Sequence, residues 1–191
     1  MTAAPPRVMA TGTLVVLREK TLDDARDDYA WRRDPELAAY DAARPLSSSF
    51  RTFVATMADD LRHPTAYRRT FAIEDPETGR HIGNVMYYGY DANRRDAELG
   101  ITIGDRDYWS KGYGSDAART MVAYLFEQRG LERVCLHTLT WNHRAQAAFE
   151  KAGFRRLRTV ERDGYVFELM EIWRREYDPD GTRTGPHLPG R

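Results

Sequence analysis

Apolar residues recur at two different spacings along the chain. At positions 115–129 they follow a helical spacing, with Ala118, Met121, Val122, Leu125 and Phe126 on one face and Gly130 beyond it as a C-cap. Three further helices are predicted over 22–33, 50–61 and 142–152, the first opened by the N-cap candidate Thr21 and closed by Asp34-Pro35. The pattern therefore predicts three or four helices separated by extended segments.

Alternating and β-branched runs predict strands between these helices. They cover 13–18, 69–74, 81–90, 97–103, 133–140, 154–160 and 165–174. Turn residues at 75–79 and at Asp163-Gly164 indicate that two pairs of these strands form hairpins. This order is typical of an α/β (α+β) domain with a mixed sheet.

The length of 191 residues suits one domain, which we place at 13–177. Residues 1–12 are expected to be a flexible N-terminus. Residues 178–191 are rich in Pro and Gly and nearly lack apolar side chains, so they are predicted to form a disordered tail.

Charge and cysteine content narrow the class of protein. Lys and Arg number 29, and Asp and Glu also number 29, so no overall field attracts nucleic acid or an anionic membrane. No run of about eighteen apolar residues is present, and the single Cys135 cannot form an internal disulfide, which together predict a soluble, cytoplasmic protein. The five histidines lack metal-ligand spacing, so no metal is expected.

The turn that precedes the 115–129 helix has a composition suited to phosphate. It reads Tyr108-Trp-Ser-Lys-Gly-Tyr-Gly-Ser115 and follows a predicted strand. The first N–H groups of a helix have no intrahelical partner and carry partial positive charge, and glycines let a phosphate approach the backbone. An ordinary strand–turn–helix connection is the commoner explanation of an isolated Gly-x-Gly, so the neighbouring motifs decide.

Three segments in a fixed order carry a family resemblance. They are Ala97-Glu-Leu-Gly-Ile-Thr-Ile-Gly104, the turn 108–115, and Asn142 followed by Gly153-Phe154. Over about residues 13–176 the chain resembles the GNAT superfamily of acyl-CoA-dependent N-acyltransferases, and within it the RimJ/RimL-like branch. The resemblance implies a mixed, mostly antiparallel seven-stranded sheet with splayed central strands and flanking helices.

The resemblance also implies acetyl-CoA as cosubstrate. Its pyrophosphate is expected on the turn and its pantetheine arm beside the strand 97–103, with the Thr102 amide polarising the thioester carbonyl. Asn142 is either a helix N-cap or a pantetheine contact, and Phe149 stands where many members carry a Tyr that protonates the thiolate. The expected cofactor-binding residues are Ile101, Thr102, Ile103, Trp109, Lys111, Gly112, Tyr113, Gly114, Ser115, Asn142 and Phe149.

The acceptor amine must lose a proton to attack a thioester. A lysine-like amine costs about 4 to 5 kcal/mol to deprotonate at neutral pH, and an α-amine about 1 kcal/mol. Glu98 lies fourteen residues before Gly112, which matches the spacing of the catalytic Glu in the family's histone-acetylating members. Glu98 is therefore the base candidate, with pairing to Arg94 or Arg95 as the structural alternative.

Aromatic residues are the candidates for the acceptor pocket. Trp31 lies where family members close this site, and Tyr87 and Tyr88 lie on the strand 81–90. Neighbouring residues on a strand face opposite sides of the sheet, and packing alone explains such tyrosines equally well. We list Trp31, Tyr87 and Tyr88 as expected substrate-binding residues.

These expectations define an N-acetyltransferase that transfers an acetyl group directly to a primary amine. The first acceptor hypothesis is a protein N-terminal α-amine. The alternatives are a small amine such as a polyamine or an aminoglycoside, and a non-catalytic CoA-binding regulatory module, the latter motivated by Phe149. Members of the family often dimerise, so a homodimer is compatible with the resemblance.

Overall fold

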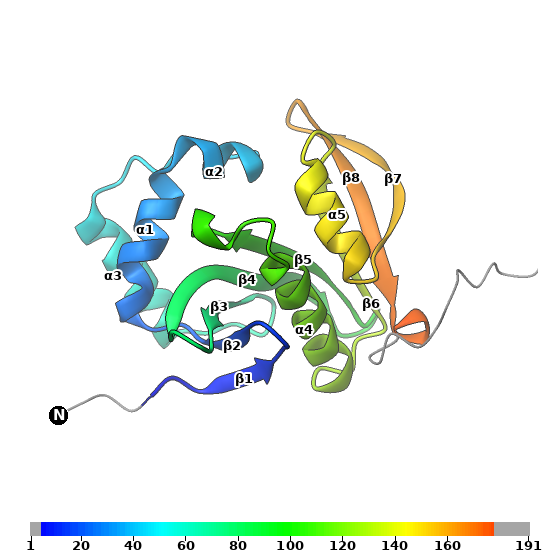
Figure 1. Ribbon diagram of the computed structural model, residues 1–191, viewed down its shortest axis with the longest axis horizontal. Coiled ribbons are helices and arrows are strands. Elements are labelled where there is room, and N and C mark those ends of the chain that lie inside the picture. The colour runs from blue at the N-terminus through cyan, green and yellow to red at the C-terminus, as the bar shows by residue number, and fades with distance from the viewer. Residues whose placement is uncertain (1–4, 178–191) are drawn as a thin grey trace, which may run out of the picture.

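The computed structural model describes residues 5–177 and contains one eight-stranded sheet (Figure 1). The spatial order is β1-β2-β3-β4-β5-β6-β8-β7. Every neighbouring pair is antiparallel except β5 and β6, which are parallel. The strands are β1 Val8–Thr11, β2 Val16–Glu19, β3 Arg69–Asp75, β4 Arg80–Asp91, β5 Asp96–Ile103, β6 Arg133–Leu139, β7 Arg155–Arg162 and β8 Tyr165–Trp173.

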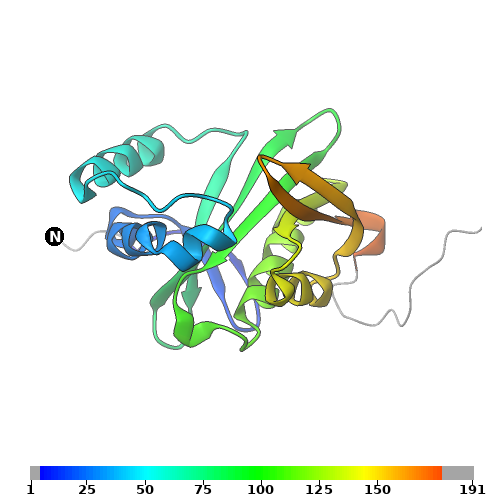
Figure 2. The ribbon, with the colours of Figure 1, turned by 90° about the horizontal axis from the view of Figure 1, so that it is seen from above.

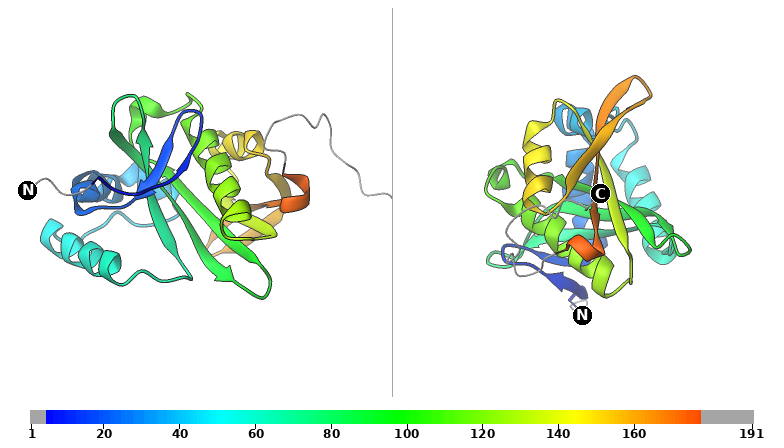
Figure 3. Two further views of the ribbon diagram at one scale, coloured as in Figure 1. Left: turned by 90° about the horizontal axis from the view of Figure 1, so that it is seen from below. Right: turned by 90° about the vertical axis from the view of Figure 1, so that its right-hand side faces the viewer.

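Five α-helices flank the sheet. They are α1 Ala25–Arg33, α2 Pro35–Tyr40, α3 Phe50–Arg62, α4 Tyr113–Glu127 and α5 His143–Lys151, accompanied by 3-10 turns η1 Leu22–Asp24, η2 Arg106–Tyr108 and η3 Arg174–Glu176. Figure 2 shows α1, α2 and α3 grouped at one end and α5 beside β7 and β8 at the other. Figure 3 shows α3 and α5 on opposite sides of the sheet.

The core lies between α4 and the strands behind it. The helix buries Ala118, Met121, Val122 and Leu125 completely, at the helical spacing seen in the sequence. Burying one such side chain contributes about 1.5 to 3 kcal/mol, so this face holds α4 firmly against the sheet. Its N-terminal end is thereby fixed beside the end of β5.

The carboxylate of Asp116 ties α4 to the first hairpin. Its Oδ2 accepts hydrogen bonds from the N–H groups of Leu14 (2.7 Å) and Val15 (3.1 Å). The side chain is therefore not available to cap its own helix, and α4 has no side-chain cap. The helix N-terminus keeps its free N–H groups.

Two short elements differ from the sequence prediction. Val8–Thr11 forms β1, antiparallel to β2, inside the segment predicted to be flexible, so the sheet has eight strands instead of seven. Residues 35–40 form α2, because Asp34 accepts hydrogen bonds from the N–H groups of Glu36 and Leu37 while Pro35 occupies the first helical turn. The predicted tail at 178–191 lies outside the described residues.

Candidate active site

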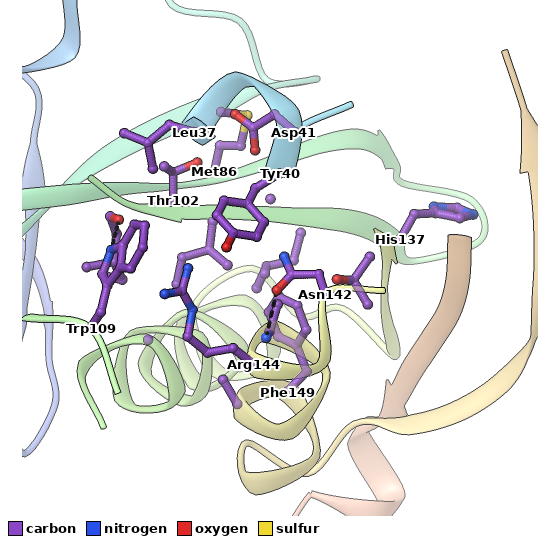
Figure 4. A pocket seen from close by; sticks show the side chains of 18 of the residues that line it. Leu37, Tyr40, Asp41, Met86, Thr102, Trp109, His137, Asn142, Arg144 and Phe149 are labelled. Atoms are coloured by element: carbon purple, nitrogen blue, oxygen red, sulfur yellow. Dashed lines mark hydrogen bonds between the residues drawn. The ribbon is translucent and has the colours of Figure 1, made fainter. Parts of the chain in front are cut away.

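The central strands separate after three paired positions. β5 and β6 pair from Asp96↔Arg133 to Glu98↔Cys135, and beyond this vertex the two strands no longer pair with each other. This confirms the predicted splay. A cavity of about 650 Å³ opens between them, bordered also by α2, α5 and the turn before α4 (Figure 4). Its size is that of a site for a small molecule or cofactor.

The unpaired edge of β5 offers backbone groups to the cavity. Gly104 N–H donates to Ile82 of β4 at 3.0 Å, whereas the Ile103 carbonyl accepts from Trp109 Nε1 at 2.6 Å on the other side. Because the backbone groups of successive residues point to alternate sides of a strand, Ile101 and Ile103 face the open edge and Thr102 faces β4. The Thr102 amide, which was expected to polarise the thioester, therefore points toward β4, and the amides on the open edge are those of Ile101 and Ile103.

The turn before α4 forms the next wall of the cavity. Ser110, Gly112 and Gly114 line it, and Gly112 adopts a left-handed conformation (φ 95°) as the N-cap residue. A Cβ built on Gly114 would meet only Ile103 Cγ1, at the ordinary distance of 3.7 Å, so the space on the side where a side chain would stand is open. Free N–H groups with open space before them fit a pyrophosphate.

Three other residues of the turn do not line the cavity. Lys111 is exposed, Tyr113 packs edge-on against Tyr108 with ring centroids 4.8 Å apart, and Ser115 is half-buried in the first helical turn. The structure therefore brings them near the expected pyrophosphate site through their backbone only.

An arginine stacked between aromatic rings crosses the cavity. The guanidinium of Arg144, from α5, lies 3.6 Å from the Trp109 ring centroid and 5.1 Å from that of Tyr40, which ends α2. Tyr40 also contacts Trp141 at 5.3 Å. Figure 4 shows the Arg144 side chain extending from α5 between Tyr40 and Trp109. Sequence reasoning did not predict this cluster, because its members come from three separate segments.

Asn142 and Phe149 lie on the α5 side of the cavity. Asn142 caps this helix, since its Oδ1 accepts from the Ala145 N–H at 3.2 Å, and it also lines the cavity. Phe149 is buried and packs against Phe154 with ring centroids 6.0 Å apart. A phenyl ring has no proton to donate, so this position supplies packing only.

Glu98 stands at the vertex with two hydrogen-bond donors. The Tyr88 hydroxyl and His137 Nδ1 each lie 2.6 Å from its Oε1. Burial works against ionisation, but these two hydrogen bonds outweigh it and hold the pKa of Glu98 below its usual value. Arg94 and Arg95, the partners of the structural alternative, bond elsewhere. Sequence reasoning assigned no role to His137, whose only signal was its alternation with Cys135.

The acceptor candidates divide between two faces of the sheet. Tyr88 lines the cavity, whereas Tyr87 is fully buried in the core beside Phe71. The expectation that Tyr87 binds substrate is therefore wrong. Neighbouring residues on a strand face opposite sides of the sheet, so Tyr87 points into the core while Tyr88 faces the cavity. Trp31 covers Gly104, where a Cβ would collide with the indole, and lines an adjoining cavity of about 80 Å³.

Charges of both signs surround the cavity. Glu98 and Asp41 are its acidic residues, and the basic ones are Arg32, Arg144, Lys151 and Arg162. Burial raises the pKa of Asp41, and attraction to Arg32 and a hydrogen bond with Thr102 only partly offset this. Within residues 5–177 no cluster of His, Cys, Asp and Glu is arranged to hold a metal ion, and none of the helices there is long and apolar enough to cross a membrane.

Known proteins share this architecture and sequence pattern. A family model described as an acetyltransferase (GNAT) domain matches residues 15–155. The uncharacterized N-acetyltransferase p20 of Bacillus licheniformis is 28% identical over 176 residues, which cover 85% of this chain and 94% of that protein. The putative ribosomal N-acetyltransferase YdaF of Bacillus subtilis (strain 168) is 28% identical over 107 residues, or 56% of this chain and 58% of that protein.

Solved structures agree with the fold. The spermidine N-acetyltransferase of Vibrio cholerae, in complex with CoA and spermine, superposes with a TM-score of 0.75 at 20% identity, covering 86% of this chain and 98% of that one. An aminoglycoside acetyltransferase, AAC(6')-Ib with coenzyme A, gives 0.69 at 20% identity over 85% and 96% of the two chains. With the family match and the splayed strands, the chain belongs to the GNAT family of acetyltransferases, which use acetyl-CoA as acyl donor.

Proposed function

We propose that this protein transfers the acetyl group of acetyl-CoA directly to a primary amine, and that the acceptor is the α-amine of a protein N-terminus, as in the RimJ/RimL-like branch. The observation that carries the proposal is the mixed charge of the cavity. Two acidic and four basic residues line it, whereas a polyamine carrying several positive charges calls for a strongly acidic wall. The similarity to a protein named as a ribosomal N-acetyltransferase supports the same acceptor.

Direct transfer is supported by the state of the only cysteine. The Cys135 thiol is half-buried and lies 3.8 Å from the Ala97 carbonyl oxygen, and burial raises its pKa to about 11. A thiol in this state is a poor nucleophile at neutral pH. An acyl-cysteine intermediate is therefore disfavoured, and the amine attacks the thioester itself.

The chain supplies binding groups for each part of the donor. The free N–H groups at the start of α4 would hold the pyrophosphate, and the open edge at Ile101 and Ile103 would hold the pantetheine arm. The thioester that acetyl-CoA brings is the activated acyl group. An Ile101 N–H aimed at the developing oxyanion contributes on the order of 3 kcal/mol in comparable sites.

A small amine is the second candidate acceptor. The adjoining cavity of about 80 Å³ carries the carboxylates of Asp28 and Asp41 beside Arg32 and Arg44. Because Asp28 pairs with Lys20 Nζ at 2.7 Å, Asp41 is the carboxylate there that would meet an ammonium group. Solved GNAT structures of similar fold are named as spermidine and aminoglycoside acetyltransferases. Their sequence identity of 20% supports the fold and leaves the acceptor to experiment.

A thiol-release assay separates these acceptors. Acetyl-CoA is incubated with the protein and with peptides bearing free or blocked N-termini, spermidine, or an aminoglycoside, and free CoA is measured. We expect release with free N-terminal peptides and little with blocked ones. Higher kcat/KM for spermidine or the aminoglycoside would replace the peptide acceptor by a small amine. Tight acetyl-CoA binding by calorimetry without release from any amine would identify a non-catalytic CoA-binding module.

A further inference from the structure

We propose that His137 takes the proton from the attacking amine. Glu98 is the positioning residue, and its hydrogen bond holds the His137 imidazole in place. This inference rests on the proposed acetyl transfer to an amine and names the proton's route. It changes the role of Glu98, which sequence reasoning had assigned as the base.

The hydrogen bond between the two side chains fixes the state of the imidazole. His137 Nδ1 lies 2.6 Å from Glu98 Oε1. An ionised carboxylate only accepts hydrogen bonds, so the hydrogen in this contact belongs to Nδ1. A neutral imidazole then carries a lone pair at Nε2. Within residues 5–177 no protein group hydrogen-bonds to Nε2 of His137.

The position of the pair suits the reaction. Glu98 and Cys135 are the last paired residues of β5 and β6, and His137 lies two residues further along the same face of β6. Its side chain is 10% exposed and lines the cavity, as does that of Glu98 at 17%. Figure 4 shows His137 and Trp109 at opposite ends of the cavity. His137 thus lies at the vertex end of the cavity, away from the expected pyrophosphate site.

Titratable groups from three strands surround this pair. Tyr88 comes from β4, Cys135 from β6 and Arg162 from β7, while β8 contributes the apolar ring of Phe167, whose centroid is 6.3 Å from that of the His137 ring. Glu98 is the group bonded directly to the imidazole, so it orients the ring. The Tyr88 hydroxyl donates to the same oxygen and keeps the carboxylate ionised and oriented.

Glu98 alone is a weak base for this step. Its hydrogen bonds lower its pKa against the effect of burial, which widens the gap to any amine. An imidazole is the side chain whose ordinary pKa lies nearest neutrality, and a general base is most efficient when its pKa lies near the pH at which the enzyme works. The pair therefore divides the work as a carboxylate and imidazole do in hydrolytic triads.

From the neutral amine, which has already given its ammonium proton to water, the proton balance closes with this one residue. The amine nitrogen forms a bond to the acetyl carbon while its proton moves to His137 Nε2. The bond from that carbon to sulfur then breaks, and the sulfur leaves with the electron pair. The imidazolium returns its proton to the thiolate and is neutral again. This route needs no hydroxyl at Phe149, the position where many relatives of the family carry a tyrosine.

The test compares three variants on one acceptor whose turnover by the wild-type protein has been established. We expect His137→Gln to lower kcat by about 100-fold or more and to leave KM nearly unchanged, because the imidazole that takes the proton is gone. Glu98→Gln keeps a hydrogen bond to the ring but removes the charge, so we expect a smaller loss of kcat, about 10-fold. His63→Gln, directly after α3 and with a side chain 71% exposed, is the matched control and should leave kcat and KM unchanged.

A second measurement does not depend on turnover. Nitrogen-15 NMR of the histidine rings, with His137 assigned from its missing signal in His137→Gln, should show the hydrogen of the neutral ring on Nδ1 in the wild type and a larger share on Nε2 in Glu98→Gln. Unfolding midpoints and CoA affinity establish that each variant is folded. A loss of kcat that is larger in Glu98→Gln than in His137→Gln would return the base role to Glu98. Absence of wild-type turnover with every amine would instead overturn the proposed function, which the variants alone do not test.

Discussion

Replacing Gly114 tests where the pyrophosphate binds, because binding and stability should change in opposite directions. Gly114 is the second residue of α4, and a Cβ there would meet only Ile103 Cγ1 at 3.7 Å. Gly114→Ala should therefore be accepted without strain and gain up to about 1 kcal/mol of helix propensity. For a chain of this size that gain raises the unfolding midpoint by about 2 to 4 °C.

The same methyl group occupies the space in which a phosphate would approach the helix. Losing one charge-assisted hydrogen bond costs about 1.5 to 3 kcal/mol, or about a 10- to 100-fold increase in the Kd of acetyl-CoA. The bulkier Gly114→Val should weaken binding further. Isothermal titration calorimetry with acetyl-CoA and thermal unfolding of the free protein measure the two effects separately.

Gly112→Ala is the contrasting variant. Gly112 has a φ of 95°, a backbone conformation in which a side chain costs about 1 to 2 kcal/mol of stability. The unfolding midpoint of Gly112→Ala should therefore fall. If Gly114→Val is folded and binds acetyl-CoA as tightly as the wild type, the pyrophosphate does not lie at the start of α4. A loss of affinity accompanied by a lowered midpoint in both variants would point to general damage to the turn.

Urea unfolding of three further variants and one surface control tests the contacts that hold the fold together. Asp116→Ala leaves two N–H groups of the first hairpin unpaired and should lower the free energy of unfolding by about 3 kcal/mol, whereas Asp107→Ala, on the surface, should change it by less than about 0.5 kcal/mol. Burial opposes ionisation of Asp24, but the hydrogen bond from Arg18 holds its pKa below 3.8. The ionised side chain therefore stabilises the fold near neutral pH, and this contribution is lost as the pH falls below 3.8. The difference in free energy of unfolding between the wild type and Asp24→Asn should accordingly be largest near neutral pH and shrink below pH 3.8. Asn142→Ala removes a helix cap and should cost about 1 kcal/mol; an unchanged value would deny the cap.

Long helices and strands could be predicted because the spacing of their apolar residues repeats several times along the segment. The helix predicted at 115–129 is observed at Tyr113–Glu127, and the strand predicted at 97–103 is observed at Asp96–Ile103. β1 and α2 were missed because they have four and six residues, too few for a period to emerge. β1 exists through its pairing with β2, and that partner is invisible to a local pattern.

Orientation within a strand was the harder part of the candidate site. Tyr87 and Tyr88 are adjacent in sequence, yet one is in the core and the other bonds Glu98. Which of the two faces the cavity depends on the register of β4 against β5, since a shift by one residue exchanges the faces. The contact between His137 and Glu98 joins residues 39 positions apart, and only the parallel pairing of β5 with β6 brings them together.

The two halves of the cavity differ in the parts of the sequence that form them. This difference decides which half a sequence motif can identify. The donor half uses backbone groups of β5 and of the Gly112 to Gly114 turn, so its signature is glycine placement, which stands in one continuous stretch. The half that we propose for the acceptor is lined by side chains from α1, α2, β4, β6 and β7 and by Asp41 directly after α2, among them Arg32 and His137. Such side chains change without altering the fold, so acetyl-CoA use follows from the family, whereas the acceptor depends on these walls. Substitutions at Asp41 and Arg32 should therefore change the preference among amines and leave the Kd of acetyl-CoA unaltered.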